Sequence, residues 1–259
     1  MNIVVCVKQV PDTWAERTLR PDDSRLDRAS VDGVINELDE YAIEEGLRLA
    51  EAHGGEVTIL SMGPDKASES IRKALSMGAD KAVHLIDDGL AGSDALATSL
   101  AIAQVLGRTG FDLVILGSES TDARMGVLAA MLAERLGVPQ LSQASKVEVD
   151  GTAIRINRQA EYGYDTVEAV LPAVVSVVEK INEPRYPSFK GIMAAKKKPV
   201  ETLSLADAGI DPGQVGGASA ATEVVSFAKR PPRQAGTVVK DEGDGGVKAA
   251  EFLAAQKFI

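Results

Sequence analysis

Residues 57–86 read VTILSMGPDKASESIRKALSMGADKAVHLI and contain one complete strand–helix–strand unit. The apolar runs Val57–Met62 and Ala82–Ile86 are typical of strands that are covered on both faces of a parallel sheet. Between them, Pro64 suits the first turn of a helix and Gly78 suits the residue that ends it. Parallel strands joined by a helix use a right-handed crossover, so this stretch indicates an α/β fold.

The same unit recurs through the first 140 residues. Further strands are predicted at Ile3–Val7 and Phe111–Leu116, and helices at Asp39–His53, Ser93–Leu106 and Met125–Leu136. These elements predict a doubly wound, mostly parallel sheet with helices on both faces. Ligands of such sheets bind where loops leave the carboxyl ends of the strands, so we expect a site there.

The pattern changes after Pro139. Strands without intervening helices are predicted at Lys146–Val149, Ile154–Ala160, Asp165–Val170 and Ala173–Glu179, which indicates an antiparallel edge portion. Residues 201–246 contain many glycines and no sustained period, so an extended arm is expected there, followed by a helix with an apolar stripe. We therefore expect an α/β domain at 1–200 and a C-terminal arm and helix at 201–259.

Composition excludes several classes of function. A net charge of −10 opposes binding to a phosphate backbone, so nucleic acid is not an expected partner. The apolar stretch at 171–178 is too short to span a bilayer and the N-terminus has no basic region of a signal peptide, which predicts a cytoplasmic protein. One cysteine excludes an internal disulfide, and two histidines in unrelated segments predict no metal site.

Familiar catalytic motifs are also missing from the sequence. There is no G-x-G-x-x-G after the first strand, no G-x-x-x-x-G-K-[ST] and no G-x-S-x-G, which disfavours a dehydrogenase, a P-loop enzyme and a hydrolase. No catalytic residue is expected. Any redox role would need an organic cofactor, much of it held by another chain.

The loop that follows the strand at 111–116 could hold a phosphate. Residues 117–122 read GSESTD, and their small side chains allow backbone N–H groups and the next helix N-terminus to approach an anion. The alternative is an ordinary turn with a helix cap.

Residues 182–199 have the composition of a stiff, exposed loop. Pro184 and Pro187 predict extended backbone, Gly191 permits a turn, and Ile192–Ala195 predict a short helix. Phe189 is expected near the tip, where a partner would meet it. The lysines at 196–198 are either a solvated helix end or a binding patch.

Four segments together resemble the beta subunit of electron-transfer flavoproteins. They are NEPRYPSFKGIMAAKKK (182–198), VVCVKQV (4–10), IRKALSMGAD (71–80) and LPAVV (171–175). The resemblance implies a heterodimer in which an alpha subunit holds most of the FAD. It also implies an electron carrier that receives electrons from acyl-CoA and related dehydrogenases and passes them to a quinone-linked oxidoreductase.

In this family the beta subunit carries AMP with no known redox role. The resemblance places that AMP at Cys6, Asn36, Glu37, Leu38, Asp39, Met62, Gly117, Ser118, Ser120, Thr121, Asp122, Arg124, Met125, Gly126, Val127 and Leu128. After Asp122 this sequence departs from the pattern of many members, and Arg124 is expected to bind phosphate oxygens instead. Positions near the flavin ring fall at Thr13 and Leu38.

The same resemblance makes the proline-rich stretch the recognition loop for partner dehydrogenases. Its partner-binding residues would be Tyr186, Pro187, Ser188, Phe189, Lys190, Ile192 and Met193, with Phe189 in the place of an anchoring apolar side chain. The apolar stripe of the C-terminal helix predicts that the arm and helix pack on the partner subunit, and the alternative is that the helix folds back onto its own domain. Two alternatives remain: a bifurcating form with a second FAD in place of AMP, and a stand-alone adenine-nucleotide sensor or ligase. This sequence lacks the Ser-Gly-Gly-x-Asp-Ser pyrophosphate loop of such ligases, which counts against a ligase.

Overall fold

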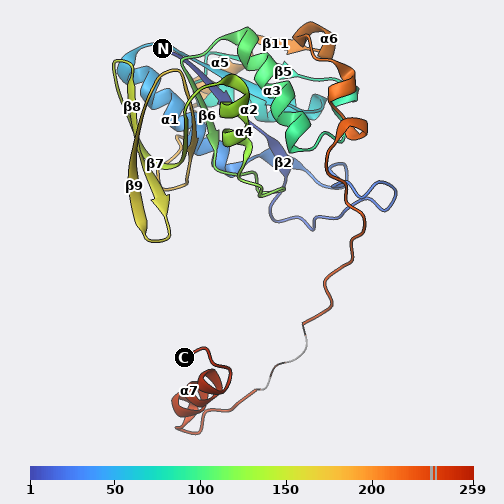
Figure 1. Cartoon of the computed structure of the whole chain (residues 1–259), viewed down its shortest axis with the longest axis vertical. Helices are drawn as coiled ribbons and strands as arrows, with labels where there is room; N and C mark the ends of the chain where they lie inside the picture. The colour runs from blue at the N-terminus through green and yellow to red at the C-terminus, as the bar shows by residue number, and fades with distance from the viewer. Residues whose placement is uncertain (234–235, 237) are drawn as a thin grey trace. The chain divides into compact units, whose positions relative to one another are not determined.

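The computed structural model describes residues 1–233, 236 and 238–259, and it divides into two units, Met1–Val225 and Ser226–Ile259. The first unit is built on a nine-stranded sheet with the order β11-β5-β4-β1-β6-β10-β7-β8-β9 (Figure 1). The strands are β1 (Asn2–Cys6), β4 (Glu56–Met62), β5 (Lys81–Leu85), β6 (Leu113–Gly117), β7 (Gln140–Asp150), β8 (Ala153–Ala160), β9 (Gly163–Val170), β10 (Ala173–Val177) and β11 (Val200–Leu203). Pairing is parallel from β11 to the start of β7, and antiparallel from β7 to β9.

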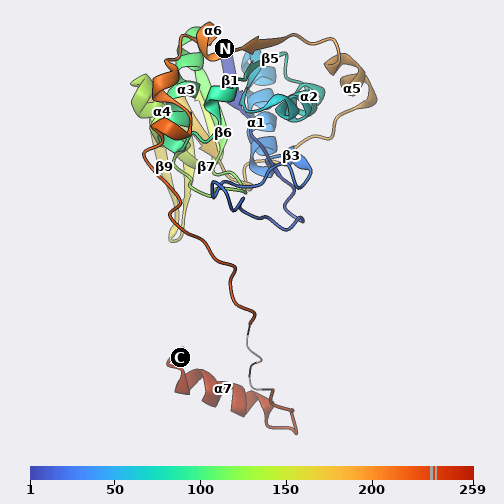
Figure 2. The ribbon, with the colours of Figure 1, turned by 90° about the vertical axis from the view of Figure 1, so that its right-hand side faces the viewer.

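Helices cover both faces of this sheet, which confirms the predicted doubly wound α/β fold (Figure 2). Side chains of β1 alternate between two apolar cores: Ile3 and Val5 belong to one, and Val4 and Cys6 to the other. Because both faces are covered, the strand reads as a continuous apolar run. The first core is closed by α1 (Glu37–His53), α2 (Ser68–Met77) and α5 (Phe189–Ala195), and the second by α3 (Ala95–Thr109), α4 (Leu128–Leu136) and α6 (Leu205–Ala208).

Two sequence predictions need correction. Strand β10 was expected with the antiparallel edge, but it lies in the interior of the sheet and pairs in parallel with both β6 and β7. All five of its residues are buried, as a strand between two helical layers requires. Helix α4 begins at Leu128, three residues later than expected. The positive φ angles of Arg124 and Gly126 keep the preceding turn out of a helical conformation.

Residues 201–246 were expected to form an extended arm, but the first part of this stretch returns to the sheet and packs in the second core. Strand β11 pairs in parallel with β5, and Ser204 begins α6 with a capping box. Leu205, Ile210 and Val215 are buried in the second core. Short 3₁₀ turns complete the unit at η1 (Asp65–Ala67), η2 (Asp88–Leu90), η3 (Pro212–Gln214) and η4 (Gly217–Ser219).

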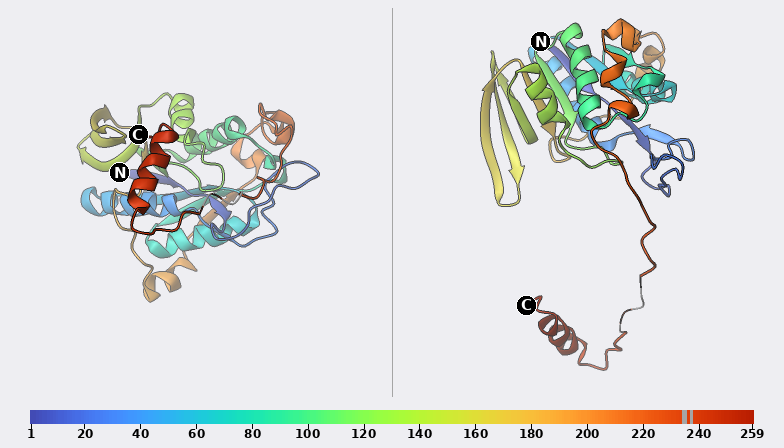
Figure 3. Two further views of the ribbon diagram at one scale, coloured as in Figure 1. Left: turned by 90° about the horizontal axis from the view of Figure 1, so that it is seen from below. Right: turned by 45° about the vertical axis from the view of Figure 1, so that its right-hand side comes forward.

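Residues 12–32 form a long loop between the strands of a separate two-stranded sheet, β2 (Gln9–Pro11) and β3 (Gly33–Ile35). This loop and the β8–β9 hairpin lie at opposite ends of the first unit (Figure 3). The loop is anchored to the rest of the unit by arginines: the Arg17 guanidinium donates to the carbonyl of Thr121, and Arg28 pairs with Asp122.

The second unit contains one helix, α7 (Gly245–Ala255), and the described residues before it form neither helix nor strand. No residue of α7 is buried, although Val247, Phe252 and Leu253 are large and apolar. Within the described part of the chain, no helix is both long and apolar enough to cross a membrane.

Candidate functional site

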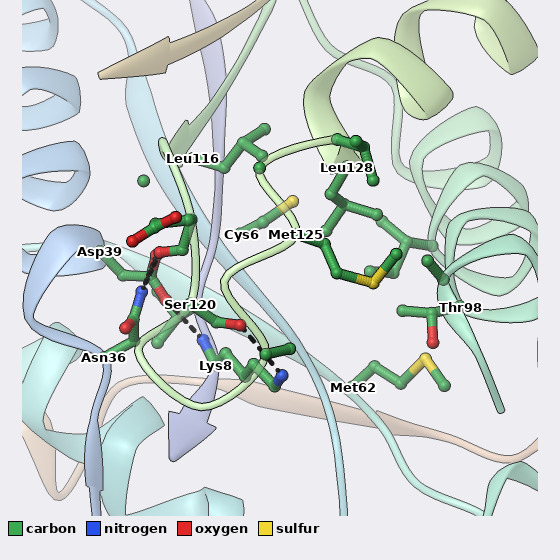
Figure 4. Close-up of a pocket in the computed structure, with 18 of the residues that line it drawn as sticks. Cys6, Lys8, Asn36, Asp39, Met62, Thr98, Leu116, Ser120, Met125 and Leu128 are labelled. Atoms are coloured by element: carbon green, nitrogen blue, oxygen red, sulfur yellow. Dashed lines mark hydrogen bonds between the residues drawn. The ribbon is translucent and has the colours of Figure 1, made fainter. Parts of the chain in front are cut away.

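A cavity of about 460 Å³ opens at the carboxyl ends of β1, β4 and β6. This is the edge of the sheet where the sequence predicted a ligand site. Eleven of the sequence-predicted pocket residues line it: Cys6, Asn36, Asp39, Met62, Gly117, Ser118, Ser120, Met125, Gly126, Val127 and Leu128. Figure 4 shows Asn36, Asp39, Lys8 and Ser120 gathered on one side and Met62, Thr98, Met125 and Leu128 on the other.

The other five predicted residues lie beside the cavity without lining it. Glu37 and Arg124 are exposed, and the Arg124 guanidinium lies 3.8 Å from the Glu119 carboxylate. Leu38 and Thr121 are half-buried. Asp122 does not line the cavity itself, but its carboxylate contacts Lys8 and Arg28, which do.

Sequence reasoning missed one whole wall of the cavity. Ser93, Asp94, Ala95, Thr98 and Ile102 line it from the start of α3, and Thr222 adds to it from the segment after η4. The position of Asp94 at a helix start after a parallel strand was a visible signal. Thr222 gave no such signal. Its Oγ1 donates to Asp94 Oδ2 at 3.2 Å, and Asp94 is far from it in sequence.

Asn36 ties the start of α1 to the loop that follows β6. Its Nδ2 donates to the carbonyl of Glu119 at 3.0 Å and to Asp39 Oδ1 at 3.0 Å, and the N–H of Thr121 donates to its Oδ1 at 3.0 Å. Asn36 occupies the N-cap position of α1 but its side chain makes no capping hydrogen bond. The amide of Asn36 therefore bonds to the backbone of the loop and not to the free N–H groups at the start of α1.

Gly117 allows this close approach. A Cβ at Gly117 would lie 2.7 Å from Asp39 Oδ1 and 2.8 Å from the carbonyl carbon of Leu38, closer than real contacts allow. A side chain there would push the loop away from α1. The glycine at the end of β6 thus fixes the distance between two walls of the cavity.

Asp122 is the electrostatic anchor of the loop. Its side chain is 1% exposed, and it accepts hydrogen bonds from Lys8 Nζ at 2.9 Å and from Arg28 Nη2 at 2.6 Å. Burial disfavours the carboxylate, but the charges and hydrogen bonds of Lys8 and Arg28 outweigh burial and hold the pKa of Asp122 below its usual range. The buried Asp122 carboxylate and its two partly exposed cations therefore fasten the loop to the segment after β1 and to the 12–32 loop.

Asp39 lies in the opposite electrostatic environment. Burial raises the pKa of this carboxyl to about 7, although it accepts a hydrogen bond from the Lys8 N–H at 2.8 Å and another from Asn36. Burial, together with the nearby Asp39 charge, also raises the pKa of the Cys6 thiol to about 12. Cys6 is therefore a packed, unreactive thiol at the cavity floor.

The raised pKa of Asp39 predicts a specific pH dependence of stability. Between the ordinary pKa of 3.8 and about 7, the folded chain holds a proton that the unfolded chain has lost. The free energy of unfolding should therefore fall as pH rises through this range, by about 1.4 kcal/mol per pH unit for this group. Asp39→Asn should remove this component. Urea unfolding of both forms between pH about 5 and about 7 measures it, and identical slopes would contradict the prediction.

Comparison with known proteins gives a consistent answer. The electron transfer flavoprotein domain matches residues 24–208. The chain is 53% identical to the electron transfer flavoprotein subunit beta of Mycobacterium leprae over 264 residues, covering 100% of this chain and 99% of the relative. It is 52% identical to the same subunit of Mycobacterium tuberculosis with the same coverage. Identity to the subunit beta of Megasphaera elsdenii is 37% over 271 residues, covering all of both chains.

These identities extend over the full length of the chain, including the observed sheet and the signature segments, and all of these relatives are beta subunits of electron transfer flavoproteins. The chain belongs to the beta subunits of electron transfer flavoproteins, a family of electron carriers.

Proposed function

We propose that this chain is the AMP-bearing, dehydrogenase-docking subunit of a heterodimeric electron carrier. FAD held mainly by an alpha subunit accepts electrons from acyl-CoA and related dehydrogenases and passes them to a quinone-linked acceptor. The heterodimer works in the cytoplasm, and this chain itself catalyses no bond-making step. The observation that carries the proposal is the cavity at the ends of β1, β4 and β6 in a chain of this family.

The phosphate of AMP fits the loop before α4. In the part of the chain that the structure describes, the N–H groups of Met125, Gly126 and Val127 bond to no protein acceptor. Arg124 and Gly126 have positive φ on either side of Met125, an alternation that makes backbone N–H groups converge on an anion. The N-terminus of α4 adds its dipole at the same place. AMP supplies no redox chemistry there and acts as a structural ligand.

The remaining wall of the cavity suits an adenine ring. Leu60, Met62 and Ile102 present apolar surface, and Thr98 adds a hydroxyl beside them. The cavity volume falls within the roughly 300–1,000 Å³ typical of small-molecule sites. An apolar half and an anion-binding half in one cavity support a mononucleotide.

A second feature supports docking to dehydrogenases. Tyr186 and Phe189 are 93% and 81% exposed, and Ile192 and Met193 are about half exposed beside them. We call these four residues the docking patch. Pro187, Ser188 and Lys190 lie between them in sequence, and Ser188 Oγ accepts the N–H of Gly191 at 3.0 Å to begin α5. Large apolar groups on a short, capped helix suit a partner pocket.

The release of bound nucleotides tests the cavity's ligand. The chain is co-expressed with an alpha subunit, the complex is purified and denatured, and the released nucleotides are counted. One FAD and one AMP per heterodimer are expected. Two FAD would replace the proposal with the bifurcating form, and a monomer with neither flavin nor partner would support a nucleotide sensor instead.

A further inference from the structure

The segment that carries the docking patch is fastened to α1 by Arg185. Its Nε and Nη2 donate to the Glu44 carboxylate at 2.7 and 3.0 Å, and its Nη1 donates to Glu51 at 2.6 Å. The backbone N–H of Arg185 also donates to Glu44, at 3.2 Å. One carboxylate therefore fixes both the main chain and the side chain of the residue directly before Tyr186.

A neighbouring contact fixes the chain three residues earlier. Asn182 Nδ2 donates to the carbonyl of Tyr41 at 3.1 Å and to Glu45 Oε2 at 3.1 Å. Between Asn182 and Tyr186 the backbone includes Pro184, whose ring restricts its own φ and the conformation of the residue before it. The approach to the docking patch therefore has little conformational freedom.

The far end of the segment is fastened to α2. Lys198 Nζ donates to the carbonyls of Leu75, Gly78 and Ala79 at 3.0, 3.0 and 2.6 Å, and so satisfies the end of that helix. Lys198 is thus distinct from the exposed Lys196 and Lys197 of the same run.

Helix α5 also lies directly against α2. Arg72 Nη1 donates to the carbonyl of Ala195 at 2.7 Å. A Cβ at Gly191 would lie 2.5 Å from the carbonyl oxygen of Ser76, so only glycine permits this approach. The patch is therefore held at both ends while its own side chains stay in water.

We call the contacts of Arg185 with Glu44 and Glu51 the clamp. Compared with the contacts of Lys198, the clamp has the clearer link to function, because it lies directly before Tyr186. The Glu44 side chain is only 8% exposed, and a buried carboxylate requires a hydrogen-bonded cationic partner. The planar fork of arginine forms a two-point pair with each of the two carboxylates, which the three donors of a lysine ammonium cannot reproduce. A loop fixed in its bound conformation avoids the ordering cost that a mobile loop would have to meet when the partner binds.

We propose that Arg185, held by Glu44 and Glu51, is a positioning residue that sets Tyr186 and Phe189 in their docking conformation before the dehydrogenase arrives. This proposal rests on the docking role of the patch. It assigns to Arg185 an effect on encounter with the partner, and none on the flavin or on the cavity.

The test uses the co-expressed heterodimer as the electron acceptor of an acyl-CoA dehydrogenase from the same organism, over a concentration series. Arg185→Lys should raise the KM for the heterodimer about fivefold with kcat unchanged. Hydrogen exchange at residues 183–193 should rise in this variant. Glu51→Gln removes only the exposed part of the clamp, so it should raise KM by less than Arg185→Lys. This variant keeps the proposal testable if Arg185→Lys does not assemble.

The double variant distinguishes positioning from a separate contact. In a Phe189→Ala background, Arg185→Lys should change KM by less than about twofold, because the anchoring one of the two side chains that it positions is gone. Arg155→Lys is the matched control: Arg155 Nε pairs with Glu168 at 2.7 Å, both side chains are exposed, and the pair lies on the β8–β9 hairpin. It should leave the kinetics unchanged.

The outcomes separate the two proposals. Additive effects of Arg185→Lys and Phe189→Ala, or a KM unchanged by Arg185→Lys when Phe189→Ala raises it, would overturn the positioning role alone. If Phe189→Ala leaves KM unchanged, the docking role fails and the positioning role fails with it.

Discussion

Deletion of residues 226–259 is expected to weaken assembly with the alpha subunit by at least about 100-fold, while residues 1–225 remain folded. The nine-stranded sheet and both apolar cores lie within Met1–Val225. By contrast, α7 buries none of its residues and leaves Val247, Phe252 and Leu253 exposed. Burial of one such side chain is worth about 1.5–3 kcal/mol, so burial of three against a partner exceeds the free energy of a 100-fold change.

Size-exclusion chromatography of the co-expressed complex, followed at decreasing concentration, measures this effect. Phe252→Ser should reproduce part of the loss. Lys248→Ser on the same helix is the matched control, because Lys248 is polar and pairs with the neighbouring Asp244, at 2.9 Å. If the shortened chain assembles normally but unfolds at a lower temperature, α7 packs on its own chain and the proposed contact with the alpha subunit is wrong.

Phe189→Ala is expected to lower kcat/KM for electron transfer from an acyl-CoA dehydrogenase by about 30-fold, with flavin content unchanged. Phe189 is the first residue of α5, directly after the Ser188 cap, and its ring stands almost entirely in water. A side chain of this size on a clamped helix buries a large apolar area in a partner at little cost in ordering. The loss should therefore fall on recognition of the donor.

Steady-state kinetics over a series of heterodimer concentrations measures the loss. Tyr162→Ala provides the matched control, because Tyr162 is also a highly exposed aromatic residue but lies at the turn between β8 and β9. Its substitution should leave kcat/KM unchanged. Equal losses in both variants would indicate a general effect on the complex, and no loss in Phe189→Ala would exclude the ring as an anchor.

The sequence alone predicted the parallel part of the sheet well, because each strand and helix there has a local signal. Val57–Met62 and Ala82–Ile86 were expected as strands, and the structure has them at Glu56–Met62 and Lys81–Leu85. The glycine stop at Gly78 was also visible, and its φ of 146° explains why a glycine stands there. Burial on both faces produces such signals without reference to distant residues.

Family signatures extended this prediction to the cavity. Eleven predicted residues line it because they lie at strand ends or in the loops and helix starts that follow, which the alternation of strands and helices already located. The sequence did not identify Lys8 and Arg28 as the partners of Asp122, or Thr222 as part of the cavity wall. These contacts join segments that are far apart along the chain.

The sequence by itself thus determined the fold class, the edge of the sheet that holds the cavity, and the stiff loop that ends in Phe189. Only the tertiary structure decided that β10 lies inside the sheet, that β11 adds to its edge, and that Arg185 fastens the loop to α1. The physical reason is the range of the interactions. Periodicity and turn residues report the surroundings of neighbouring residues, whereas strand order and ion pairs depend on which distant segments the folded chain brings together.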